Sequence, residues 1–260
     1  MMNHIYKKTL LAGCIVILAM PVYSEETGES QPVKEDLTEA ELENKIGRMG
    51  DPVYQVPEDY EFSEAEVKMW FSDHLENITE PTVLMYEFTK TGTYEEGFND
   101  TVFLEIKQIN EDGTKNADMK FFTGERKQYI RPENVTNITG NPVLGIYMQG
   151  DIYEMDRYTG GSWRYFLNSI KSSIHDNAVV EPVEFEFSGK IYSGEKISFR
   201  PYLDDPKRRQ FEKFANKTYE LIFSEEIPGR LFQISTIIHP EEGASEPLVK
   251  EVLTLAEISQ

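Results

Sequence analysis

The sequence predicts an α+β fold: a curved, half-barrel-like antiparallel β-sheet of about eight or nine strands, with a few helices packed on one face. Three observations predict it. Most apolar stretches after residue 80 alternate with polar residues, which is the period of a half-buried strand. Short turns join neighbouring stretches, and this favours antiparallel pairing over βαβ crossovers. Two other stretches space their apolar residues three and four apart, as amphipathic helices do.

The first 24 residues have the pattern of a secretory signal peptide. Lys7 and Lys8 supply its positive charge, residues 9–20 an apolar core and residues 22–24 a small-residue cleavage site. The apolar core is shorter than the ~20 residues of a membrane-spanning helix. We therefore expect an exported, periplasmic chain that is not integral to the membrane. The alternative is a lipoprotein anchored through Cys14, because residues 11–14 match a lipoprotein cleavage box.

Residues 25–60 are acidic and poor in large apolar side chains, so we expect a flexible leader. A short helix is expected within it from Thr38, because Thr38 and Glu41 have the spacing of a capping box. Residues 61–260 are expected to form a single α+β domain.

A longer helix is predicted from Ser63, where Ser63 and Glu66 form a second capping box. Its apolar stripe consists of Val67, Trp70, Phe71, His74, Leu75 and Ile78. We interpret His74 as a packed, hydrogen-bonded core residue. Strands are predicted at residues 83–89, 101–109 and 116–123, with an Asp-Gly turn at residues 110–113. Residues 124–139 are expected to be a strand end and an irregular loop.

The second half of the chain begins with residues 142–153, which are apolar enough for a buried strand broken by Gly145 and Gly150. A helix is predicted after Ser162, with Trp163, Phe166, Leu167, Ile170 and Ile174 on its buried face. Strands follow at residues 183–187 and 196–201, with a turn at Ser193-Gly194. A short helix is expected from Pro206 to Phe214, and the last strands at residues 219–223, 230–238 and 248–255.

Composition excludes several classes of function. Cys14 is the only cysteine, so a chain cleaved after residue 24 has no disulfide, no thiolate nucleophile and no cysteine metal site. The formal net charge is −20, and −22 after Lys7 and Lys8 are removed, which repels phosphate backbones. We expect no nucleic-acid partner. His74, His175 and His239 lack the spacing of a zinc site, and we expect no metal and no cofactor.

One stretch carries a resemblance. It reads GNPV at residues 140–143, D-x-x-x-M-x-R-x-T-G-G at residues 151–161 and Y-F-x-N-x-I at residues 165–170. This series resembles a stretch of exported bacterial proteins. The resemblance implies export and brings no activity with it.

The same stretch contains the candidate ligand-binding residues. Gly160 and Gly161 enter a predicted helix, so free backbone N–H groups there, with Arg157 and Arg164, suit an anion. The alternative is a tight turn, with the arginines paired to Asp151, Glu154 or Asp156. The residues proposed to contact a ligand are Tyr147, Met148, Tyr153, Arg157, Tyr158, Gly160, Gly161, Trp163 and Arg164. We interpret Lys207, Arg208 and Arg209 as a solvated face.

The leading functional hypothesis is a non-enzymatic exported module that binds an apolar or amphipathic ligand, or an envelope protein, through the open sheet. Such a layout resembles that of the periplasmic half-barrel carriers of lipids or lipoproteins. One alternative is an envelope glycan or peptide hydrolase with Asp151, Glu154 or Asp156 as acid and base. Another is an accessory protein that adds a strand at a sheet edge.

Overall fold

The computed structural model describes residues 60–126, 133–240 and 245–260. The expected signal peptide, the Cys14 anchor and the helix at Thr38 lie outside the described residues, as does nearly all of the acidic leader. In the described part of the chain, no helix is both long and apolar enough to cross a membrane.

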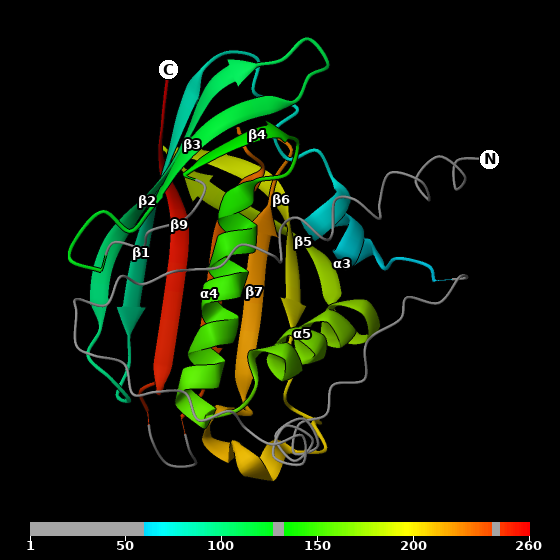
Figure 1. Ribbon diagram of the computed structural model, residues 1–260, viewed down its shortest axis with the longest axis vertical. Helices are drawn as coiled ribbons and strands as arrows, with labels where there is room; N and C mark the ends of the chain where they lie inside the picture. The colour runs from blue at the N-terminus through cyan, green and yellow to red at the C-terminus, as the bar shows by residue number, and fades with distance from the viewer. Residues whose placement is uncertain (1–59, 127–132, 241–244) are drawn as a thin grey trace, which may run out of the picture.

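Within the described residues, nine antiparallel strands form one open sheet in the order β4-β3-β2-β1-β9-β8-β7-β6-β5, so the predicted fold class is confirmed (Figure 1). The strands are β1 (Thr82–Thr91), β2 (Phe98–Ile109), β3 (Lys115–Phe121), β4 (Asn134–Ile138), β5 (Val179–Phe187), β6 (Lys190–Phe199), β7 (Lys217–Phe223), β8 (Leu231–Ile238) and β9 (Val249–Ser259). β1–β4 and β5–β9 are two meanders, and the last strand joins them by pairing with both β1 and β8.

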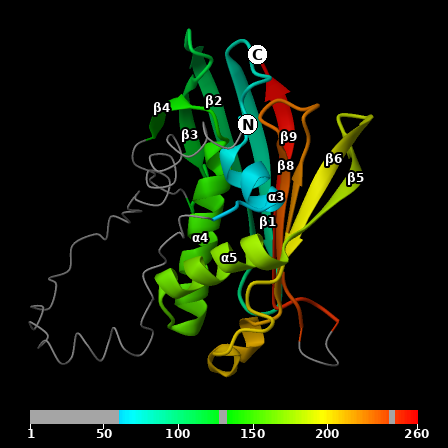
Figure 2. The same cartoon turned by 90° about the vertical axis from the view of Figure 1, so that its right-hand side faces the viewer.

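The helices of the first two thirds of the chain lie on one face of this sheet, and the last two short ones lie beyond its lower end (Figures 1 and 2). The β5–β6 hairpin bends away from the other strands (Figure 2). The helices are α3 (Glu64–Glu66), η1 (Val67–Phe71), α4 (Pro142–Thr159), α5 (Trp163–Asn177), η2 (Arg208–Gln210) and η3 (Glu212–Phe214). The longest of the described helices, α4, lies over the middle of the sheet and roughly along its strands, and α5 follows it after a turn at Gly160 (Figure 1). The core lies between these helices and the sheet.

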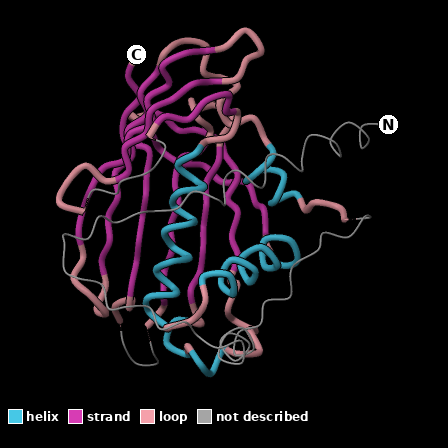
Figure 3. The backbone as a smooth tube through the Cα atoms, viewed as in Figure 1, coloured by secondary structure: helices cyan, strands magenta, loops and turns pink. Residues whose placement is uncertain are grey.

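Helix α4 corrects the prediction of a buried strand at residues 142–153 (Figure 3). The Asn141 side chain caps the helix by accepting a hydrogen bond from Val143 N, and Pro142 occupies the first turn, where a missing N–H costs nothing. The buried residues are Val143, Leu144, Tyr147, Met148, Gln149, Asp151, Ile152 and Met155. Most of them recur three and four apart, which is helical spacing, whereas alternation was absent.

The first helix begins as predicted, because Ser63 and Glu66 form both hydrogen bonds of the capping box. It ends early, at Phe71, after the π-helical turn η1. A π-helical turn holds an extra residue and rotates the buried face. Val67 is therefore exposed and Met69 buried, against the predicted stripe. His74, Leu75 and Ile78 are buried beyond the helix end.

His74 is a packed core residue, as expected. Asn141 N–H donates to its Nδ1 at 3.1 Å, so its Nε2–H donates to the carbonyl of Lys68 at 2.7 Å. Burial lowers the pKa of this imidazole, which keeps it neutral.

Three smaller predictions also need correction. The turn between β5 and β6 lies at Ser188-Gly189, where both residues have positive φ as a two-residue turn requires. The turn predicted at Ser193-Gly194 is therefore wrong, because these residues are inside β6. The segment expected to be a loop before residue 139 contains the edge strand β4. The short helix predicted from Pro206 is replaced by η2 and η3, although Phe211 and Phe214 are buried as expected.

Helix α5 is confirmed after Ser162, with Phe166, Ile170 and Ile174 buried. The Ser162 side chain makes no capping hydrogen bond, so this helix starts without the expected side-chain cap. The remaining predicted strands match β1, β2, β3, β5, β7, β8 and β9.

Candidate functional site

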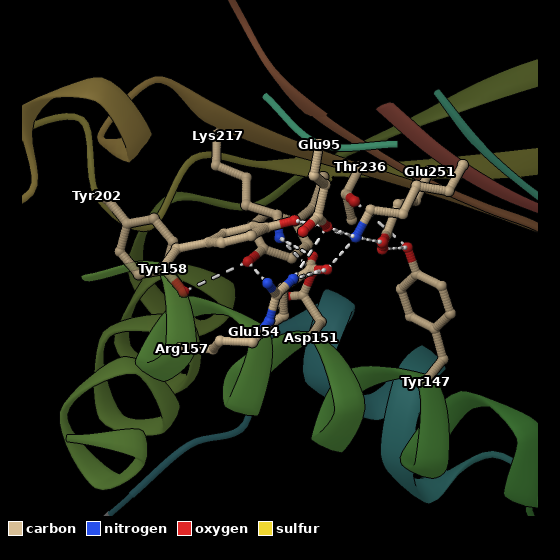
Figure 4. Close-up of polar contacts among 12 residues, drawn as sticks. Glu95, Tyr147, Asp151, Glu154, Arg157, Tyr158, Tyr202, Lys217, Thr236 and Glu251 are labelled. Atoms are coloured by element: carbon tan, nitrogen blue, oxygen red, sulfur yellow. Dashed lines mark hydrogen bonds and ion pairs between the residues drawn. The ribbon is translucent and has the colours of Figure 1, made fainter. Parts of the chain in front are cut away.

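Five charged side chains meet between α4 and the sheet, and we call them the ionic layer (Figure 4). They are Lys90 of β1, Asp151 and Glu154 of α4, Lys217 of β7 and Glu251 of β9. The two lysine side chains are 6% and 1% exposed, so the layer is shielded from solvent. Buried charges at this density require partners at close range.

Strand register explains how two of these residues, Lys90 and Glu251, come to face α4. Lys90 pairs with Glu251 across β1 and β9, and Glu251 pairs in turn with Thr236 of β8. Thr236 pairs with Tyr219 of β7. Because cross-strand partners point to the same side of a sheet, the four polar side chains form one row on the face that α4 covers.

Lys90 holds one end of the layer. Its ammonium contacts the carboxylates of Glu154 and Glu251, the latter at 3.0 Å, and that of Glu95 at 2.5 Å. It also donates to the hydroxyl of Tyr158 at 3.0 Å. Burial opposes the charge on Lys90, but the carboxylates of Glu251 and Glu154 outweigh it and raise the pKa of this lysine.

Lys217 and Asp151 hold the other end. The Lys217 ammonium donates to one carboxylate oxygen of Asp151, and Tyr219 OH donates to the other at 2.7 Å. Burial opposes the charge on Lys217, yet Asp151 and the other carboxylates raise its pKa. Burial raises the pKa of Asp151, while the Lys217 ammonium and the Tyr219 hydroxyl, which both donate to its oxygens, favour its ionised form. The Tyr219 hydroxyl also lies 3.3 Å from that of Tyr202.

Glu251 is a member of the layer whose pKa is raised. Burial, followed by the negative charge of Glu154, raises its pKa to about 7. Its second oxygen accepts a hydrogen bond from Tyr147 OH at 3.2 Å. Glu154 behaves in the opposite way: burial disfavours its charge, but Lys217 and Lys90 lower its pKa.

A further ion pair, between Arg157 and Glu95, lies at the margin of the layer. Arg157 donates to Glu95 at 2.9 Å, and Tyr158 OH donates to the same oxygen at 2.5 Å. Hydrogen bonds from Arg157 and from Lys90 overcome desolvation and lower the pKa of Glu95 to about 2. Arg157 therefore pairs with Glu95 and, at 3.5 Å, with Glu154. Glu154 is one of the carboxylates named as partners of this arginine in the tight-turn alternative.

The carboxylates of Asp151, Glu154 and Glu251 each place an oxygen within 4.8 Å of the others. Three carboxylates at this distance suit a divalent cation. The ammonium groups of Lys90 and Lys217 already contact these oxygens, however, and a cation would have to displace them. The three histidines of the described residues are not part of this cluster, because His74, His175 and His239 bond to Lys68, Glu66 and Thr218 respectively.

The acid–base pair suggested for a hydrolase is arranged differently from the expectation. Asp151 and Glu154 are three residues apart on a helix and share its sheet-facing side. Asp156 is two residues beyond Glu154, about 200° around the helix, so it belongs to another face. The two clustered carboxylates are ion-paired and enclosed, an arrangement that a polymeric substrate does not reach.

The nine residues proposed to contact a ligand lie in four places. Tyr147 and Tyr158 face the sheet and bond to the ionic layer or its margin, and Met148 is buried. Tyr153 is exposed, its ring 6.2 Å from that of Trp163, while Arg164 lies over the Trp163 ring at 4.8 Å. Gly160 and Gly161 line a hollow. Arg157 lies at the margin of the ionic layer.

This hollow, of about 430 Å³, lies at the turn between α4 and α5. It is lined by Thr159, Gly160, Gly161, Tyr165, Phe166, Lys207, Gln210 and Phe211. The Lys207 ammonium lies 4.8 Å from the centre of the Tyr165 ring, and no carboxylate of the described residues pairs with it. The backbone N–H of Gly161 donates to Thr159 Oγ1 at 3.1 Å, so this group is already bonded.

Sequence reasoning missed Lys90, Lys217 and Glu251. A signal was present, since each occupies a core-facing position in an alternating strand. Lys90 continues the row of Leu84, Tyr86 and Phe88. Lys217 precedes Tyr219, Leu221 and Phe223, and Glu251 stands between Val249 and Leu253. A charge in a core-facing row demands a buried counter-charge, and this points to a site.

No protein-family model and no curated protein matches this sequence. Among solved structures, the chain is similar to the lipoprotein LppX of Mycobacterium tuberculosis, with a TM-score of 0.31 and 10% identity over 75% of this chain and 94% of LppX. It is also similar to a LolA superfamily protein of Nitrosomonas europaea, with a TM-score of 0.20 and 8% identity over 77% of this chain and 94% of that one. Neither similarity assigns a family or a ligand to the chain.

Proposed function

We propose that the protein is a non-enzymatic, exported binding module that holds a small amphipathic anion in the hollow between α4 and α5. The observation that carries the proposal is the pairing, in one hollow, of aromatic rings with an ammonium group that has no carboxylate partner among the described residues. Pockets of about 300–1,000 Å³ with apolar walls and a few polar groups are typical of small-ligand sites.

The chemistry of the lining defines the ligand class. Phe166 and Phe211 offer apolar surface to a hydrocarbon or aromatic body, and Lys207 offers a positive charge to a carboxylate or sulfonate. Gly161 keeps the wall open, because a Cβ atom there would lie 2.7 Å from Cε2 of Phe166. The volume suits one short chain or ring system rather than a lipid with several acyl chains.

The most direct test is native mass spectrometry of the mature protein purified from its own host. We expect an added mass that is released by organic solvent and behaves as an amphipathic acid. A chain that is recovered empty and that cleaves envelope polymers would contradict the proposal and favour the hydrolase.

Two substitutions locate the ligand. With anilinonaphthalene sulfonate as the probe, Lys207→Gln should weaken binding about three- to fivefold, because it removes one partly exposed charge interaction. Gln210→Trp should abolish binding, because the indole fills the hollow from its exposed rim. Lys213→Gln is the matched control, since Lys213 is an exposed lysine of η3 that does not line the hollow. Equal affinity in all four proteins would exclude this site.

A further inference from the structure

We propose that the ionic layer is a proton-dependent latch: α4 is held on the sheet while Asp151, Glu154 and Glu251 share one proton, and loosens when that proton leaves. The charge count of the layer is the starting point. Three carboxylates face two ammonium groups, Lys90 and Lys217. The neighbouring Arg157 and Glu95 pair with each other at 2.9 Å and add no net charge. The layer is therefore neutral with one proton and carries −1 without it.

An unbalanced charge matters here because the layer is enclosed. An ionised group without a counter-charge in a protein interior costs several kcal/mol unless it is solvated. Glu154 is 13% exposed at the margin, but the other four side chains of the layer are 9% exposed or less. Water can solvate these four fully only if α4 moves away from the strands, since α4 covers them on that side (Figure 4). Loss of the proton thus favours a state in which α4 is lifted.

The proton is best placed on Glu251. This carboxyl is faced from α4 by Tyr147, Asp151 and Glu154, from β1 by Lys90 and from β7 by Lys217. From β8 it is faced by Thr236, which does not titrate and whose hydroxyl lies 3.3 Å from that of Tyr147. Two of the four ionised neighbours are negative, and only Lys90 lies within ion-pair distance.

The direction of the pH effect follows from linkage. The pKa of Glu251 is raised to about 7 in the closed state, against about 4.5 in water. Between these values the closed state binds one more proton than the open state. The contribution of Glu251 to the free energy of closure is therefore complete below about pH 4.5 and is lost as the pH rises through 7. From pH 6 to pH 8 the opening equilibrium of α4 should increase about tenfold.

The latch also bears on the hollow, because Thr159 at the end of α4 forms part of its lining. Loosening α4 should therefore release a ligand from the hollow as the pH rises. This second step rests on the proposed function, whereas the latch itself does not.

Hydrogen exchange followed by mass spectrometry on the full chain tests the latch, at pH 6 and pH 8 after correction for intrinsic exchange. We expect the opening of residues 142–159 to increase about tenfold, while β1 and β2 remain unchanged. Glu251→Gln, which keeps the shape and removes the charge, should leave α4 equally protected at both pH values. Glu257→Gln, an exposed glutamate on the same strand, should behave as the wild type.

Equal protection of α4 at pH 6 and pH 8 in the wild-type protein would overturn the latch. So would a Glu251→Gln variant that keeps the full pH dependence. Binding of anilinonaphthalene sulfonate at the same two pH values separates the second step. If α4 loosens and probe affinity stays constant, the latch stands and its link to the hollow is refuted.

Discussion

At the scale of single residues, Lys217 is a lysine whose side chain is 1% exposed and whose ammonium contacts Asp151. Replacing it with methionine keeps the volume but leaves the Asp151 carboxylate buried beside Tyr219 with only a neutral donor. Removing one partner of a buried ion pair costs about 3–5 kcal/mol. We expect Lys217→Met to lower the free energy of unfolding in urea by about that amount.

A second substitution separates the lost ion pair from a packing defect. Adding Asp151→Asn to Lys217→Met removes the orphaned charge and keeps an acceptor for Tyr219, so most of the lost stability should return. The half-buried surface lysine Lys196, which pairs with Glu181 and Glu220, is the control, and Lys196→Met should change stability by less than about 1 kcal/mol. If the double variant is no more stable than the single one, packing rather than charge explains the loss.

Residue-level inference from the sequence succeeded for His74, because an apolar environment on both sides of a histidine indicates burial. It failed for the ionic layer for two reasons. Each strand was interpreted alone, so a lysine in a core-facing row was not matched to an acid in a distant strand. Residues 142–153, which include Asp151, were also interpreted as a strand, so the helical spacing that places Asp151 and Glu154 on one face was not recognised.

At the scale of elements, α4 contains a glycine that its geometry does not require. Gly150 is exposed in the helix interior, and a Cβ atom there would have no heavy atom within 4 Å. A helix-interior glycine costs about 0.5–1 kcal/mol relative to alanine. We expect Gly150→Ala to raise the free energy of unfolding in urea by that amount.

Gly161 is the matched opposite case. A Cβ atom there would lie 2.7 Å from the ring of Phe166, which is buried and cannot move freely. Gly161→Ala should therefore destabilise the protein by about 1–3 kcal/mol. If Gly150→Ala and Gly161→Ala changed the free energy of unfolding in the same direction, the turn and the helix would not be packed as described.

The start of α4 offers a test of how its cap is built. Asn141 Oδ1 accepts from Val143 N, and Nδ2 donates to Tyr86 OH at 2.9 Å and to the carbonyl of Gly229 at 3.0 Å. Asn141→Ala should cost about 2–4 kcal/mol in urea unfolding, from the lost cap and the unpaired buried groups. Asn141→Asp keeps the cap but places a carboxylate against the Gly229 carbonyl, so this variant should be no more stable than Asn141→Ala. Full recovery with aspartate would mean that only the cap matters.

The elements that sequence reasoning placed correctly share one property: their apolar period was not interrupted. β1, β7 and α5 each present a continuous row or stripe. In α4, two glycines and buried polar residues such as Gln149 and Asp151 interrupt the stripe. The Asn141-Pro142 pair was the remaining helical signal, and it is a stronger indicator of a helix start than the glycines are of a strand.

At the scale of the whole molecule, the last strand joins the two halves of the open sheet. β9 pairs with β1 over nine residues and with β8 over six, so it joins the meander β1–β4 to the meander β5–β9. Alternation predicted each strand, but no local pattern indicates which strand lies next to which. The central position of β9 is a consequence of tertiary packing, and the sequence analysis left the strand order open.

This topology predicts one cooperative unit, as the single-domain expectation requires. Amides of β1, β8 and β9 should exchange with solvent only by global unfolding, because these strands are paired on both sides and carry the buried residues Tyr86, Ile234 and Leu253. Amides of the edge strands β4 and β5 should exchange faster through local opening. Hydrogen exchange at several low urea concentrations measures the free energies of both global unfolding and local opening. If β1–β3 and β6–β8 reached two different limiting free energies, the meanders would be separate units and β9 would be a weak joint between them.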